Sequence, residues 1–191
     1  MTIFEMHHAF KSRINRFDAN TFEDLTPDVI DYFLNTSMQL LMDDSRYKRA
    51  WEHHLTVRKE IVIDDQLTIP NVLPHPVRRF IRVTYERDGR STRAIVTSSP
   101  TSSFFDTFWM RHDDETLTFS HRGKWTIDYV RNHKPLFVGG YDTPNRYFGL
   151  DTGYSATDPA VSLEVPDEEG MHNMIVEEAV RLFIETITLH R

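Results

Sequence analysis

The sequence predicts an α+β fold in which N- and C-terminal helices pack as a helical cluster and a central antiparallel β insert lies between them. Apolar residues recur at helical spacing near both ends of the chain, whereas the middle alternates with the period of two typical of strands. Pro70, Pro74 and Pro76 also exclude a helix through the start of the middle region. We expect residues 1–60 and 166–191 to form the helical core of one domain and residues 61–165 to form a β-rich insert with long loops.

The composition is that of a folded protein without covalent staples. The chain has 191 residues, 39% hydrophobic, which is enough for one sizeable core. It contains no cysteine, which excludes disulfides and thiolate metal sites. A formal net charge of −7 opposes indiscriminate binding to nucleic acid. We expect neither a secretory signal nor a membrane span, since charged residues interrupt every apolar run.

Three helices are predicted in the first 60 residues. Thr2 and Glu5 fit a capping box, and Thr26 followed by Pro27 and Asp28 is typical of a second helix start. The run 43–45 indicates the start of a third helix, whose shared face is expected to extend from Tyr47 to Arg58. A final helix is predicted from Pro166 onward. The predicted buried positions of these helices are Phe10, Ile14, Ile30, Phe33, Leu34, Leu40, Leu41, Trp51, Ile175, Ala179, Leu182 and Phe183.

The clearest local signal in the middle region is Asp88-Gly89 between two alternating runs, which predicts a β-hairpin with a two-residue turn. The expected pairs are Arg87 with Arg90, Tyr85 with Thr92, Val83 with Ala94 and Ile81 with Val96. A second hairpin is predicted around residues 121–123. We further expect a long functional loop over residues 139–159.

The first hairpin carries a local concentration of positive charge on an acidic molecule. Two interpretations remain open: a solvated strand face whose charges discourage edge pairing, or a contact surface for DNA phosphate or an acidic partner. The candidate contact residues are Arg78, Arg79, Arg82, Arg87, Arg90 and Arg93. A second candidate surface is the aromatic cluster Phe104, Phe105, Phe108 and Trp109, which is either core or interface.

No catalytic or metal motif competes with an interaction role. Glu5 with His8 and Glu169 with His172 have the spacing of di-iron helix pairs, but the sequence offers no suitable further glutamates facing inward. No nucleophile elbow and no phosphate-binding loop is present. We therefore predict a non-enzymatic protein without catalytic residues, metal ligands or cofactor. A small hydrolase or metalloenzyme using the scattered histidines is the remote alternative.

Short motifs at both ends of the chain resemble a group of tailed-phage virion proteins. Residues 5–11 match an E-x-x-x-x-F-K helix, and residues 30–35 match the end of an E-I-D-Y-(W/F)-L-N helix. Residues 129–136 are similar to a Y-I-(K/R)-x-P-x-P-I segment, with one of its two prolines replaced. Residues 166–185 are similar to a closing L-P-x-x-x-H-x-x-I-V-x-x-A-V helix, with Val165 in place of leucine.

The proteins so resembled are neck, ring or head-to-tail connector proteins of crAss-like and related short-tailed phages. The resemblance implies a structural subunit below the portal that surrounds the DNA channel and joins capsid to tail. It further implies a homo-oligomeric ring of twelve copies in the virion, assembled in the host cytoplasm. Its expected partners are the portal protein, other neck or tail proteins and passing genomic DNA, with no membrane. A tail hub or adaptor protein is the alternative.

Overall fold

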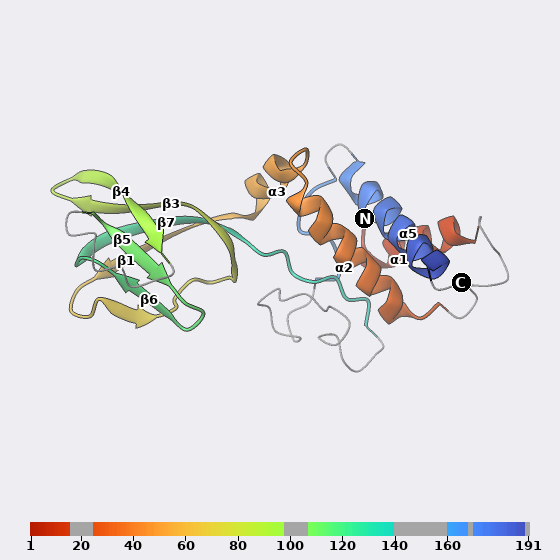
Figure 1. Cartoon of the computed structure of the whole chain (residues 1–191), viewed down its shortest axis with the longest axis horizontal. Helices are drawn as coiled ribbons and strands as arrows, with labels where there is room; N and C mark the ends of the chain where they lie inside the picture. Colours follow the sequence, from red (N-terminus) through yellow and green to blue (C-terminus); the bar gives the residue numbers. More distant parts are fainter. Residues whose placement is uncertain (16–24, 98–106, 140–159, 168–169, 190–191) are drawn as a thin grey trace. The chain divides into compact units, whose positions relative to one another are not determined.

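A computed structural model describes residues 1–15, 25–97, 107–139, 160–167 and 170–189, and these combine α-helices with β-strands (Figure 1). The prediction of a mixed helical and strand fold is therefore confirmed. The chain divides into two compact units. We call Met1–His54 with His133–Arg191 the helical unit, and Leu55–Asn132 the strand unit. In the description that follows, each unit is treated separately.

Helix α1 spans Ile3–Ile14 and begins as predicted. The Glu5 amide donates to the Thr2 hydroxyl at 3.3 Å, and the Thr2 amide donates to the Glu5 carboxylate at 2.7 Å. This reciprocal capping box satisfies two amides that a helix start otherwise leaves without partners. The predicted positions Phe10 and Ile14 are both buried.

Helix α2 spans Pro27–Asp43, with Pro27 in the first turn as predicted. Helix α5 spans Met171–Leu189, five residues later than the predicted start at Pro166. Its first turn is capped by Asp167, whose carboxylate accepts from the His172 amide at 2.8 Å. The proline therefore precedes the helix instead of opening it, and the acidic cap sits outside the helical residues.

Helices α1, α2 and α5 pack on one another, so both ends of the chain contribute to one core (Figure 1). Phe183 of α5 meets Phe10 and Phe33 edge to face, with ring centroids 5.7 and 5.3 Å apart. The Ser37 hydroxyl donates to the Ile175 carbonyl at 2.7 Å. This polar contact inside the apolar interface fixes the register of α2 against α5.

The predicted helix faces are correct at their centres and wrong at their margins. Leu40 is 48% exposed, and Leu41 and Leu182 are only half-buried. The buried stripe of α2 instead runs through Met38 and Met42. Each residue of a helix is rotated by about 100° from the one before it, so positions at the edge of an apolar face are only partly covered by the neighbouring helix.

The difference between centre and margin can be measured. We expect Phe33→Ala to lower the free energy of unfolding by about 3 kcal/mol, because it removes a buried ring and leaves a cavity. Leu182→Ala should cost about 1 kcal/mol, since half of that side chain already contacts water. Urea unfolding followed by circular dichroism provides both values. Equal losses would contradict the burial difference between the two positions.

Helix α3, Lys48–Leu55, is followed directly by strand β1, Thr56–Ile63. The expected helical face from Tyr47 to Arg58 is therefore wrong at its end, because Arg58 lies in the strand. Trp51 is 1% exposed and its ring meets that of His133 edge to face, with centroids 5.9 Å apart. The β-branched residues Thr56, Val57 and Ile61 favour the change from helix to strand.

The strand unit contains one seven-stranded sheet among the described residues, in the order β1-β7-β3-β4-β5-β6-β2. Its remaining strands are β2 (Thr68–Pro70), β3 (Val77–Arg87), β4 (Arg90–Thr97), β5 (Trp109–His112), β6 (Thr116–Phe119) and β7 (Gly123–Arg131). The prediction of an antiparallel insert is wrong for one pair, since β4 and β5 run parallel.

The sheet is curled (Figure 1), and its buried apolar side chains gather in one core. Side chains from six of its strands meet in one cluster: Ile61, Ile63, Val83, Tyr85, Ala94, Met110, Leu117, Phe119, Trp125, Ile127 and Tyr129. Trp125 lies at the centre, with its ring 5.0 Å from both Tyr85 and Phe119. The strand unit thus has a core of its own.

The second predicted hairpin does not form. Strands β6 and β7 flank residues 120–122 as expected, but β6 pairs with β5 and β2, whereas β7 pairs with β1 and β3. Phe119 and Trp125 therefore contact each other across the core and are not neighbours on two hydrogen-bonded strands. Alternation identifies a strand and its buried face, but it does not identify the partner strand.

The two units divide at residues 54/55 and 132/133, whereas the predicted domain boundaries were 60/61 and 165/166. Residues 55–60 belong to the strand unit, because β1 pairs with β7 along its whole length. Residues from His133 belong to the helical unit, where Leu136 forms a parallel bridge with Ala160. The predicted loop over residues 139–159 lies almost wholly outside the described residues.

Candidate interaction surface

The Asp88-Gly89 hairpin forms with the predicted register. Asp88 and Gly89 have φ angles of 53° and 72°, the left-handed values that a two-residue turn between strands requires. Val83 pairs with Ala94, Tyr85 with Thr92 and Arg87 with Arg90. No pairing joins Ile81 to Val96, so the fourth expected pair is wrong. Val83, Tyr85 and Ala94 of the inner face are buried, whereas Ile81, Thr92 and Val96 are exposed.

The structure distributes the six predicted contact arginines over different environments. Arg78 is half-buried, and the other five are exposed. Arg82 forms an ion pair with Asp128 at 3.1 Å, and Arg87 approaches Asp88 at 3.7 Å. Arg78 and Arg79 also have partners. Arg90 and Arg93 make no ion pair with a described residue, so they are the cations of this hairpin that remain available for a partner.

A row of alternating charge crosses β1, β7 and β3 on the outer face. Arg58 and Arg82 lie opposite Asp128 in the two strands that flank it. Arg58 Nε donates to Asp128 Oδ1 at 2.7 Å, and Arg82 Nη2 donates to Oδ2 at 3.1 Å. Hydrogen bonds from Arg58, and next from Arg82, lower the pKa of Asp128 despite its burial.

A second row on the same face has the opposite signs. Lys124 Nζ lies 3.3 Å from Glu60 and 3.5 Å from Glu86, one on each neighbouring strand. The hydrogen bond and charge of Glu60, followed by those of Glu86, raise the pKa of Lys124. Cross-strand pairs of this kind stabilise a sheet modestly. The two rows make the β1-β7-β3 face largely self-neutralising, which supports the solvated-face interpretation for Arg82.

Because Asp128 accepts hydrogen bonds from both Arg58 and Arg82, the free energy of unfolding is expected to fall at acidic pH. A carboxylate whose pKa is lowered by folding stabilises the fold above its unfolded pKa of about 4, and that contribution is lost as the pH falls through the folded pKa. Asp128→Asn should lower the free energy of unfolding by about 1–3 kcal/mol at neutral pH. On acidification, the variant should lose less stability than the natural chain.

Urea unfolding at several pH values below neutrality provides the measurement. Asp64→Asn is the matched control, since Asp64 is exposed and makes no ion pair with a described residue. Coincident stability curves for Asp128→Asn and the natural chain would show that the Arg58 and Arg82 contacts contribute nothing to stability.

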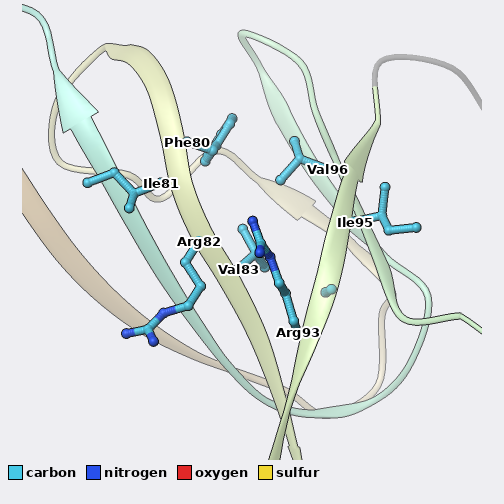
Figure 2. A pocket seen from close by; sticks show the side chains of 8 residues that line it. Phe80, Ile81, Arg82, Val83, Arg93, Ile95 and Val96 are labelled. Atoms are coloured by element: carbon cyan, nitrogen blue, oxygen red, sulfur yellow. The ribbon is translucent and has the colours of Figure 1, made fainter.

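A hollow of about 320 Å³ opens where β3 and β4 separate (Figure 2). The two strands pair only as far as Val83 and Ala94; beyond them β4 pairs with β5. Figure 2 shows the Arg93 side chain lying between the two strands, beside Val83. The remaining lining residues are Phe80, Ile81, Arg82, Ala94, Ile95 and Val96.

The lining of this hollow is suited to contact and not to catalysis. Its only charged groups are Arg82 and Arg93, and a guanidinium does not exchange protons at physiological pH. Ile81, Ile95 and Val96 are 37%, 43% and 36% exposed, which places apolar surface beside a cation. Apolar side chains with arginine at the rim are typical of a protein interface.

The structure brings together a set of polar residues that sequence reasoning missed. In the helical unit, Asn35 Nδ2 donates to the Asp31 and Leu136 carbonyls at 2.8 Å each, and the Leu136 amide donates to Asn35 Oδ1 at 2.8 Å. The Asp31 carboxylate accepts from the Val138 amide at 2.9 Å and contacts His7 Nε2 at 2.8 Å. In the sequence, the only indication of this network was that Asp31 and Asn35 lie beside the apolar face of α2.

This buried network is structural in character. Asp31 and Asn35 are 0% and 1% exposed, and their partners include the backbone of residues 136–138. Two further buried histidines also bind backbone groups: His172 Nε2 contacts the Val165 carbonyl at 2.8 Å, and His133 Nε2 accepts from the Glu164 amide at 2.9 Å. The network therefore fixes an irregular segment against α2 and α5.

The other candidate sites receive little support. Phe104 and Phe105 lie outside the described residues, whereas Phe108 and Trp109 are half-buried, and Phe108 lies 4.5 Å from the Tyr85 ring. The described residues contain no group of three side chains that could hold a metal ion. Among the described helices, none is both long and apolar enough to cross a membrane.

Comparison with known proteins does not identify a family. No protein-family model matches the chain. No curated protein matches it either.

Proposed function

We propose that this chain is a structural, non-enzymatic subunit of a head-to-tail connector ring in a tailed phage. In this proposal, both ends of the chain build the helical core of the subunit, and the strand unit is its β insert. The ring lies below the portal in the virion, surrounds the DNA channel and joins capsid to tail. Its partners are further copies of the same chain, the portal protein and adjoining neck or tail proteins.

The observation that carries the proposal is the contact between Asn35 and Leu136. Asn35 closes one of the short motifs that resemble connector proteins, and Leu136 closes another, 101 residues away. Asp31, in the first motif, binds the Val138 amide just beyond the second. His7, in the opening motif, contacts the Asp31 carboxylate at 2.8 Å.

Segments that resemble one family at separate places in the chain therefore meet in one buried network. Such convergence is expected when short motifs maintain a common architecture, because each motif supplies the partners of another. The outer surface agrees with an assembly role, since its hollow carries apolar and cationic groups without an acid or base for catalysis.

The test is the mass and shape of the purified protein, alone and mixed with its candidate portal protein. We expect a ring, or a monomer that forms a ring only on the portal, in native mass spectrometry and in negative-stain images. A stable monomer or dimer that ignores the portal would contradict the proposal.

A further inference from the structure

The two units carry charge of opposite sign. The strand unit, Leu55–Asn132, contains 12 Lys and Arg against 10 Asp and Glu, a formal net charge of +2. The rest of the chain contains 10 Lys and Arg against 19 Asp and Glu, a formal net charge of −9. The overall −7 therefore hides a strong asymmetry, and each copy of the chain presents a surface complementary to the other unit of a second copy.

Within the strand unit, part of the available positive charge lies on β4. Arg58 and Arg82 are occupied by Asp128, and Lys124 is occupied by two glutamates. Arg90 and Arg93 remain on β4 without an ion pair to a described residue, and Arg93 lines the hollow together with the exposed Ile95 and Val96. We call Ile81, Arg90, Arg93, Ile95 and Val96 the hairpin surface.

We propose that the hairpin surface docks on the acidic helical unit of a second copy of this chain, in a head-to-tail contact. The inference deepens the proposed ring function and rests on it for the closure of the ring. Arg90 and Arg93 supply the long-range attraction, and Ile81, Ile95 and Val96 supply the apolar contact around the hollow. The described helical unit exposes the carboxylates of Glu5, Asp43, Glu177 and Glu185, of which Glu5 also caps α1 and the last two also pair with Arg13 and Arg181.

Charge also decides between the possible geometries. A symmetric contact would place one hairpin surface against another and bring Arg90 and Arg93 of two copies together, which is repulsive. A head-to-tail contact pairs the hairpin surface of one copy with the helical unit of the next. The helical unit of the first copy and the hairpin surface of the second then remain available for further copies. Such contacts form a closed ring or an open filament, depending on the rotation between copies.

The absence of cysteine from the natural chain allows a site-specific test. Ile95→Cys introduces the sole thiol, which is labelled with a maleimide photocrosslinker in the hairpin surface. This variant is mixed with the natural chain uniformly labelled with ¹⁵N, irradiated and digested. Mass spectrometry of the crosslinked peptides then separates contacts between copies, which carry both isotopes, from contacts within one copy.

We expect mixed-isotope crosslinks from position 95 to residues of the helical unit. Crosslinks to the strand unit of the second copy, or no mixed-isotope crosslinks at high protein concentration, would overturn the inference. Because the crosslinks report the contact and not the ring, the two proposals fail separately. A ring without these crosslinks would retain the connector function, whereas a crosslinked open chain that ignores the portal would retain the docking contact alone.

A charge reversal provides the energetic test. Arg90→Glu with Arg93→Glu should weaken self-association about tenfold or more at low salt, and the difference should shrink at high salt. Lys48→Glu with Arg49→Glu is the matched control, since it changes the net charge equally but on exposed positions of the helical unit. Sedimentation velocity measures both variants. Equal weakening by the two pairs would show a net-charge effect and contradict docking through the hairpin.

Discussion

Replacing Trp125 with alanine should lower the free energy of unfolding of the strand unit by about 3–5 kcal/mol, since the ring is fully buried and no neighbour can fill its volume. Tyr85 and Phe119 pack against it from other strands, each with a ring centroid 5.0 Å away. The indole Nε1 also donates to the His121 carbonyl at 3.0 Å. Loss of the side chain removes both the packing and this hydrogen bond.

The conservative variant Trp125→Phe separates these two contributions. It keeps an aromatic ring in the core but removes the donor, so we expect it to cost about 1–2 kcal/mol, mainly from the smaller ring and the lost bond. Urea unfolding followed by circular dichroism measures both variants. A loss below about 1 kcal/mol for Trp125→Ala would place this residue outside the core of the strand unit.

Replacing Asn35 with alanine should destabilise the helical unit by about 3–5 kcal/mol, because three buried hydrogen bonds are lost together. The substitution removes no large apolar group, so its effect comes from the amide and carbonyl of Leu136 and the carbonyl of Asp31. An unsatisfied buried group costs about 1–3 kcal/mol each. The effect should therefore approach that of deleting a core aromatic residue.

Thr36→Ala is the matched control for this prediction. Thr36 is the next residue of α2, and its hydroxyl donates only to the Tyr32 carbonyl of its own helix in an exposed position. We expect a change of less than about 0.5 kcal/mol. Trp51 is the one tryptophan of the helical unit, so its fluorescence reports unfolding of that unit in a background of Trp109 and Trp125. Equal effects of the two substitutions would show that the network around Asn35 carries no stability.

The predicted loss of stability in Asn35→Ala also concerns the proposed connector function. The network joins the segments that resemble connector proteins, so its loss should disturb residues 133–138 as well as α2. The hairpin surface lies in the other unit and should survive the substitution.

Much of the local structure was determined by the sequence alone. The capping box of Thr2 and Glu5, the proline start of α2 and the Asp88-Gly89 turn all formed as predicted. These features depend on residues a few positions apart, whose backbone preferences act before any tertiary contact exists. The centres of the helix faces, such as Ile30, Leu34 and Ile175, were predictable for the same reason, since periodicity reports which side is apolar.

Only the tertiary structure decided which elements meet. The pairing of β7 with β1 and β3, the parallel pair β4 and β5, and the occupation of Arg82 by Asp128 all join residues far apart in the chain. Alternation and charge specify a strand and its faces but not its neighbour, because many pairings bury the same apolar side chains. The same holds for Asp31 and Asn35, whose polar side chains become buried because the backbone of residues 136–138 supplies their partners.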